Sequence, residues 1–177
     1  MRHLSIVLVG LLLGCASNPY GYAPEYVPLS EEESYNEKGL ELTYEEVRRD
    51  PEGQKGHLVA WFGTVDSVKP MGNSGDTEVA MTLHFHQERH LCSDQFDSSC
   101  RVTISDKASG PFSARLKLHA EDRSGRDGVH SGSLLKIYGN PLPEYDERGG
   151  PILKAEYYRH WPFGTYVNTR HSGNMRR

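Results

Sequence analysis

Apolar residues are scarce in this chain of 177 residues, where they make up 36% of the sequence. That content suits the core of one small domain rather than that of a large enzyme. The chain also lacks the basic excess of most nucleic-acid-binding proteins, because its formal net charge is −4. A glycine-rich phosphate loop, an H-E-x-x-H zinc motif and a G-x-S-x-G nucleophile turn are absent as well. We therefore predict a non-enzymatic domain with no catalytic residues and no nucleic-acid partner.

No hydrophobic run is long enough to cross a membrane. The run Leu4–Leu13 has ten residues and is interrupted by Ser5 and Gly10. As a helix it would span about 15 Å, roughly half of the hydrocarbon core of a bilayer. Because it directly follows the positively charged start Arg2-His3, it is typical of the apolar region of an export signal.

The leader ends in Leu12-Leu13-Gly14-Cys15, which resembles the lipobox of bacterial lipoproteins. The resemblance implies a signal peptide over residues 1–14 and a mature chain whose Cys15 carries a diacylglycerol and an amide-linked acyl chain such as palmitate. Such chains anchor a protein firmly, since each buried methylene contributes about 0.8 kcal/mol. By resemblance to enterobacterial sorting, the following Ala16-Ser17 favours the outer membrane, with the domain facing the periplasm. The alternative is an ordinary cleaved export signal followed by a chance cysteine.

The stretch after the leader predicts a flexible, disordered tether over residues 15–42. Its first part is rich in Pro and Tyr and has no apolar period, and the acidic part that follows suits a solvated face. Capping-box patterns occur at Ser30-x-x-Glu33 and Thr43-x-x-Glu46, and the second predicts a short helix over 44–49 that Asp50-Pro51 ends.

From residue 57 the pattern changes to that of strands. The first, over 57–69, carries Gly63 in its middle, which suits a bend at a barrel corner. The next, over 78–87, alternates, with Val79, Met81, Leu83 and Phe85 on one face. Shorter strands are expected over 101–105, 113–120, 134–139 and 152–158. We predict a mainly β fold, a small antiparallel barrel over residues 43–167, followed by a basic tail over 168–177.

Several segments in this order are similar to the Slp family of outer-membrane lipoproteins. They are the cysteine at 15, the helix 43–50 with its following Pro-Glu-Gly turn, the strand Leu58-Val59-Ala60-Trp61-Phe62-Gly63, the late pair 132–139 and 151–156, and His160-Trp161-Pro162. The resemblance implies an OB-like β-barrel and an outer-membrane address, and it brings no catalytic residues. An insert-like segment, 87–110, departs from the family pattern.

The sequence has three cysteines. If Cys15 carries lipid in an exported chain, Cys92 and Cys100 are expected to form a disulfide, because the compartment is oxidising. Free thiols and metal ligation are the alternatives.

A histidine cluster suggests metal binding. His84 and His86 are two apart on a predicted strand and so point to the same face, and His90 follows four residues later. These residues are candidate ligands for Zn or Cu, while a plain polar strand face is the other interpretation.

Aromatic residues suggest a binding surface for an envelope protein, a peptide or a glycan. The candidates are Trp61, Tyr157, Tyr158 and Trp161, with a role in the core as the alternative. We predict an outer-membrane lipoprotein with a structural or binding role. A metal-binding lipoprotein and an envelope enzyme acting on glycan or peptide are the alternatives.

Overall fold

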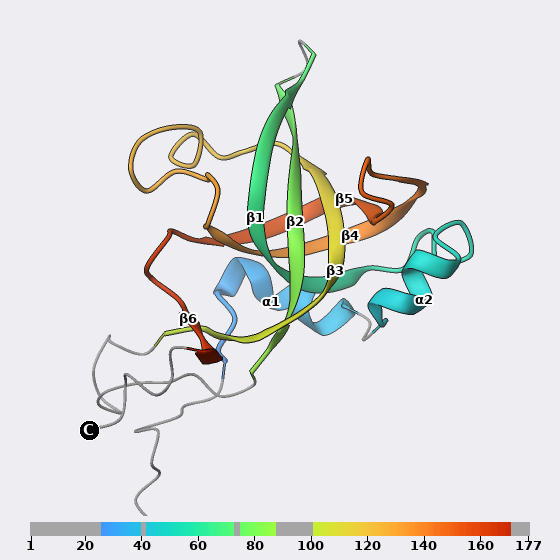
Figure 1. Cartoon of the computed structure of the whole chain (residues 1–177), viewed down its shortest axis with the longest axis horizontal. Helices are drawn as coiled ribbons and strands as arrows, with labels where there is room; N and C mark the ends of the chain where they lie inside the picture. The colour runs from blue at the N-terminus through green and yellow to red at the C-terminus, as the bar shows by residue number, and fades with distance from the viewer. Residues whose placement is uncertain (1–25, 40–41, 73–74, 88–100, 171–177) are drawn as a thin grey trace, which may run out of the picture.

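The structure is a computed structural model that describes residues 26–39, 42–72, 75–87 and 101–170. The predictions for Cys15, His90, Cys92 and Cys100 lie outside these residues. Figure 1 shows the elements, which are α1 (Ser30–Lys38), α2 (Tyr44–Arg49), β1 (Val59–Met71), β2 (Asp76–His86), β3 (Thr103–Leu116), β4 (Leu134–Tyr145), β5 (Pro151–Trp161) and β6 (Val167–Asn168). Neither of these helices is long and apolar enough to cross a membrane.

Five of the strands close into a barrel. The sheet order is β2-β1-β4-β5-β3-β6, and an additional pairing of β2 with β3 joins the two sides. β3 runs parallel to β5 and to β6, while the other neighbours are antiparallel. This closed order is that of an OB-like barrel, so the predicted fold class is confirmed.

Strand β1 curves along the barrel and passes from one partner to the other (Figure 1). Residues 59–64 pair with β4, and residues 62–71 pair with β2. Gly63 lies where the two pairings overlap, and a Cβ atom there would come within 2.6 Å of the Phe112 ring. The prediction of a long strand with a glycine at its bend is confirmed.

Strand β3 differs from the prediction. The sequence suggested separate strands at 101–105 and 113–120, but the structure has one strand over Thr103–Leu116. Leu83 pairs with Gly110 and His84 with Ala108, so Ser109 is an extra residue on β3 and forms a bulge. The Ser-Gly-Pro sequence that resembles a turn is therefore accommodated inside a bent strand. Beyond the bulge Phe85 is 63% exposed, although its alternation with Leu83 predicted burial.

Helix α1 corrects the predicted tether, since it lies within residues 15–42 and is folded. The pattern Ser30-x-x-Glu33 is not its cap, because Leu29 is the N-cap and the Glu32 carboxylate accepts a bond from the Leu29 backbone N–H at 3.1 Å. Glu32 is fully buried, so one residue of the acidic stretch is not solvated.

The barrel has a core inside and a smaller apolar cluster outside. The interior cluster includes Trp61, Phe112 and Ile137. Neighbouring strand residues point to opposite faces, so Phe62 lies outside with Leu134 and Trp161. Tyr26, from the segment before α1, packs against this outer cluster.

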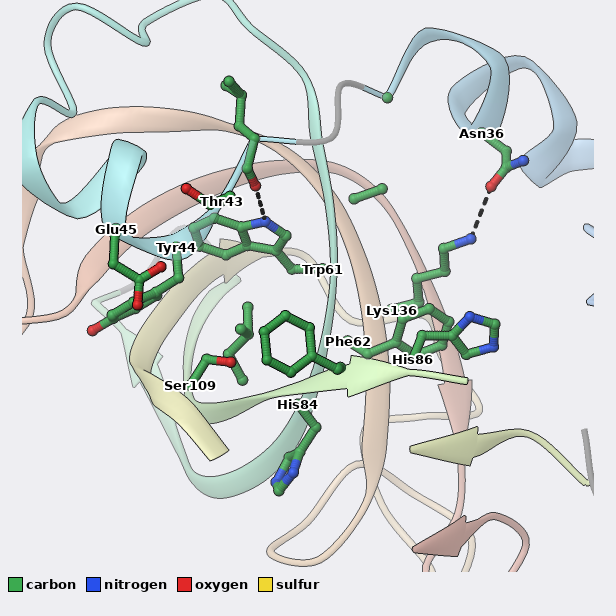
Figure 2. A pocket seen from close by; sticks show the side chains of 15 residues that line it. Asn36, Thr43, Tyr44, Glu45, Trp61, Phe62, His84, His86, Ser109 and Lys136 are labelled. Carbon is green, nitrogen blue, oxygen red and sulfur yellow. Dashed lines mark hydrogen bonds between the residues drawn. The ribbon is translucent and has the colours of Figure 1, made fainter. Parts of the chain in front are cut away.

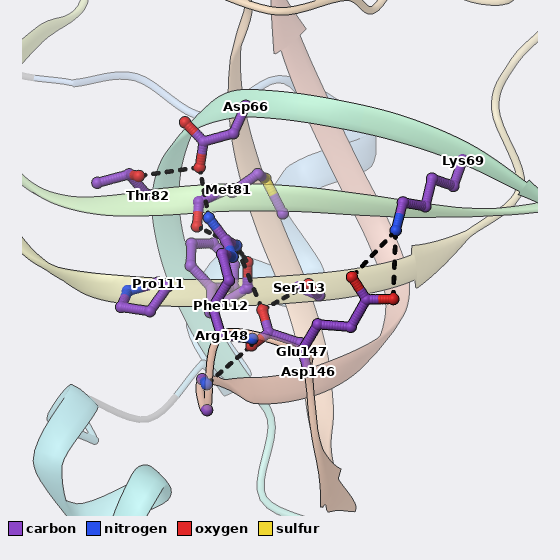
Figure 3. Close-up of polar contacts among 12 residues, drawn as sticks. Asp66, Lys69, Met81, Thr82, Pro111, Phe112, Ser113, Asp146, Glu147 and Arg148 are labelled. Atoms are coloured by element: carbon purple, nitrogen blue, oxygen red, sulfur yellow. Dashed lines mark hydrogen bonds and ion pairs between the residues drawn. The ribbon is translucent and has the colours of Figure 1, made fainter.

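The loop between β4 and β5 is tied to the barrel wall by Arg148 (Figure 3). Its guanidinium contacts Asp66 Oδ2 at 2.7 Å and Asp146 Oδ2 at 3.2 Å, and it donates to the backbone oxygens of Met81 and Phe112. Arg148 therefore acts as a structural clamp, because its donors are used within the fold.

Candidate functional site

A groove of about 580 Å³ lies between the helices, the start of β1, the end of β2 and the bulge in the middle of β3 (Figure 2). Pockets of this size with apolar walls and a few polar groups are the usual places for ligands. Its lining includes the apolar or aromatic side chains of Leu42, Tyr44, Ala60, Trp61, Phe62, Leu83 and Phe85.

The groove opens where β1 and β2 separate. Pairing of β1 with β2 begins at Phe62 and His84, so Val59, Ala60 and Trp61 have only β4 as a strand partner among the described residues. Val65 exchanges backbone hydrogen bonds with residues 132 and 133 on the β4 side. Because successive residues of a strand turn their N–H and C=O groups to alternate sides, Ala60 is the residue of this part of β1 that presents its backbone groups toward the groove.

Most polar side chains along the α2 side are already bonded within the protein. Trp61 Nε1 donates to Leu42 O at 3.1 Å, and Tyr44 OH donates to Pro111 O at 3.0 Å. The exception is Ser109, whose Oγ is buried and has no hydrogen-bond partner within the described part of the chain. The bulge residue therefore lines the groove and holds a buried hydroxyl that has no partner among the described residues.

The α1 side of the groove carries a buried ion cluster, defined here as Glu32, Lys136, Arg159, Tyr26 and Tyr138. Glu32 lies between two cations, with Lys136 Nζ at 3.2 Å and Arg159 at 3.0 Å. Tyr138 donates to the same carboxylate at 2.7 Å, and Tyr26 donates to it as well. One carboxylate faces two cations, so the cluster holds a surplus positive charge.

The surroundings of this cluster shift its pKa values. Burial by itself raises the pKa of Glu32, but hydrogen bonds from Tyr26 and Tyr138 outweigh it and lower the pKa to about 2. Burial lowers the pKa of Lys136 to about 8, although Glu32 partly offsets this effect. Burial is also the largest cause of the raised pKa of Tyr138. Glu32 is thus charged at neutral pH and holds α1 on the barrel.

The two described candidate metal ligands have separate partners. His84 Nε2 lies 3.1 Å from Thr64 Oγ1, and its Nδ1 lies 2.9 Å from Ser105 O. His86 stacks on Phe62 with ring centroids 4.4 Å apart. Among the residues that the structure describes, no three His, Cys, Asp or Glu side chains form a group that could hold a metal, and the third candidate, His90, lies outside them.

The aromatic candidates do not form an exposed surface. Trp61 and Tyr158 belong to the barrel core, and Trp161 belongs to the outer cluster. Tyr157 stacks on Tyr35 of α1 with centroids 5.1 Å apart. Trp61, Tyr158 and Trp161 are buried and have the core role that was the alternative, because a chain poor in aliphatic residues uses these rings for packing. Trp61 still contributes to the groove wall.

A buried pair at β5, formed by His160 with Asp122, was not predicted from the sequence. His160 Nδ1 lies 2.6 Å from Asp122 Oδ1, and Tyr158 OH donates to Asp122 Oδ2 at 2.6 Å. His160 Nε2 is buried and has no hydrogen-bond partner among the described residues. Burial is the largest cause of the raised pKa of Tyr158. The only signal in the sequence was a charged, glycine-rich loop over 121–128.

No family model and no curated protein matches the sequence. Among solved structures, the chain is similar to a small single-stranded DNA-binding protein from Streptomyces coelicolor. The two share 12% identity over 59% of this chain and 91% of the other, with a TM-score of 0.36. Such a distant similarity carries no argument about ligands, and the barrel class stands on the strand order.

Proposed function

We propose that this chain is an outer-membrane lipoprotein of the bacterial envelope, similar to the Slp family, whose barrel has a non-enzymatic binding role. The outer-membrane location is supported by the apolar leader that ends in Gly14-Cys15. The lipid on Cys15 anchors the chain, and the barrel faces the periplasm. In this oxidising compartment Cys92 and Cys100 form a disulfide.

The observation that carries the binding role is the groove. It combines apolar walls with an unused hydroxyl at Ser109, an exposed ring at Phe85 and a cation at Lys136. These features suit recognition of a partner, because apolar walls with a few polar groups are typical of a binding site. An envelope protein or peptide is the partner class that this lining fits.

The lipid anchor is tested with the substitution Cys15→Ser. We expect the natural protein to enter the detergent phase of a cloud-point extraction and to incorporate labelled palmitate, and the variant to lose the label. Incorporation of palmitate by the variant would contradict the proposed anchor, since no other group is proposed to carry the lipid.

The binding role is tested by crosslinking in intact cells. A photoreactive residue at Phe85, on the groove rim, should give specific adducts. The same residue at Phe163 is the matched control, because this ring is 71% exposed and does not line the groove. Equal adducts at both positions, or none at Phe85, would count against the groove as the binding surface.

A further inference from the structure

The groove offers an extended backbone edge as well as side chains. Val59–Trp61 of β1 pair only with β4 among the described residues, and Ala60, in the middle, lines the groove with its backbone N–H and C=O on the open side. An extended peptide can add to such an edge through main-chain hydrogen bonds, with alternate side chains entering the apolar walls. A simple acyl chain would leave these backbone groups unused.

Ser109 gives a second, independent observation. The residue lines a peptide-sized space, and its hydroxyl is buried and bonds to nothing in the described residues. A hydroxyl both donates and accepts, so it suits either group of a peptide bond. A buried polar group without a partner costs free energy, which a bound peptide would recover.

The ion cluster indicates which end of the ligand carries a negative charge. In Figure 2, Ser109 lies on the α2 side of the groove and Lys136 on the α1 side, where its Nζ donates to Asn36 Oδ1 at 2.9 Å. The carboxylate that lines the groove, Glu45, is on the α2 side, whereas at the α1 end Lys136 and Arg159 share the single carboxylate of Glu32. A carboxylate at this end would balance their remaining positive charge.

We propose that the groove binds a short extended peptide with apolar side chains and a carboxylate at the Lys136 end. This inference rests on the proposed binding role and names its ligand class. The carboxylate comes from the C-terminus of the peptide or from an acidic side chain, and both supply the same chemistry.

The test uses two pools of random hexapeptides, one with free C-termini and one with C-terminal amides. The full chain, held in amphipol, is incubated with each pool, and retained peptides are identified by mass spectrometry. We expect retained peptides to be apolar, with retention of the free-acid pool at least tenfold above that of the amidated pool. Retention of amidated peptides enriched in Asp or Glu also supports the proposal and assigns the carboxylate to a side chain.

Variants that spare the fold complete the test. Phe85→Glu places a negative charge on the exposed rim and should reduce retention at least tenfold, whereas Phe163→Glu should leave it unchanged. Ser109→Ala removes a hydroxyl that has no partner in the described fold and should weaken binding of a selected peptide about fivefold, the equivalent of one hydrogen bond.

The proposal is overturned if neither pool is retained, if retained peptides carry no carboxylate, or if Phe85→Glu binds like the natural chain. Normal membrane anchoring and Phe85 crosslinks alongside such a result would leave the proposed function standing and remove only the peptide ligand.

Discussion

Replacement of Glu32 by Gln tests how α1 is held on the barrel. The change keeps the shape of the side chain and removes the charge that lies between Lys136 and Arg159. Both cations then remain close together, and Lys136 is nearly as buried as Glu32, with 6% of its side chain exposed. Removal of one partner of a buried ion pair leaves an uncompensated charge, which is strongly destabilising.

The magnitude follows from two arguments. The pKa of Glu32 falls from its ordinary value of 4.5 to about 2, which corresponds to roughly 3 kcal/mol because each tenfold change in ionisation is worth about 1.4 kcal/mol. Loss of one partner of a buried pair costs about 3–5 kcal/mol. We therefore expect Glu32→Gln to lower the free energy of unfolding by about 3 kcal/mol, or the melting temperature by about 10 °C.

Urea denaturation followed by tryptophan fluorescence measures this loss, with Glu33→Gln as the matched control. Glu33 is exposed on the same helix, so its replacement should change the free energy of unfolding by less than about 0.5 kcal/mol. The pH dependence supplies an independent check. A lowered carboxyl pKa contributes stability above pH 4.5 that is lost as the pH falls toward 2, and the variant should lack this component. A loss below 1 kcal/mol, equal to that of the control, would mean that the charge of Glu32 does not hold α1 on the barrel.

Two further substitutions test the barrel itself. Gly63→Ala should destabilise the protein by about 1–3 kcal/mol in urea denaturation, because its Cβ would lie 2.6 Å from the buried Phe112 ring; an unchanged midpoint would show that this contact is not tight. Asp122→Asn should cost about 1–3 kcal/mol, since the amide cannot accept from both His160 and Tyr158, and a stability equal to that of the natural chain would mean that these two bonds contribute nothing.

Local signals in the sequence predicted the local structure well. The Thr43 hydroxyl and the Glu46 carboxylate bond as the capping box requires, and α2 ends at Asp50 as expected. The bend at Gly63 also followed from the sequence, since only a small residue suits a crowded barrel corner. In each case the residues that determine the structure are close in sequence or act through size alone.

Features that depend on distant contacts were not predictable. The sequence placed Glu32 in an acidic stretch that was predicted to be solvated. It is buried because Lys136, more than 100 positions away, reaches its carboxylate. Phe85 continues a perfect alternation, yet it is exposed because the bulge at Ser109 changes how β2 and β3 pair. The groove is lined by residues of both helices and of four strands, which are far apart in the sequence, so no sequence motif marks it.

The mass of the protein extracted from bacterial membranes shows directly whether Cys15 carries the lipid anchor. We predict an N-terminal peptide that begins at Cys15 and carries the mass of a diacylglycerol plus one amide-linked acyl chain. A peptide that begins at Met1, or one whose Cys15 thiol is free, would contradict the account.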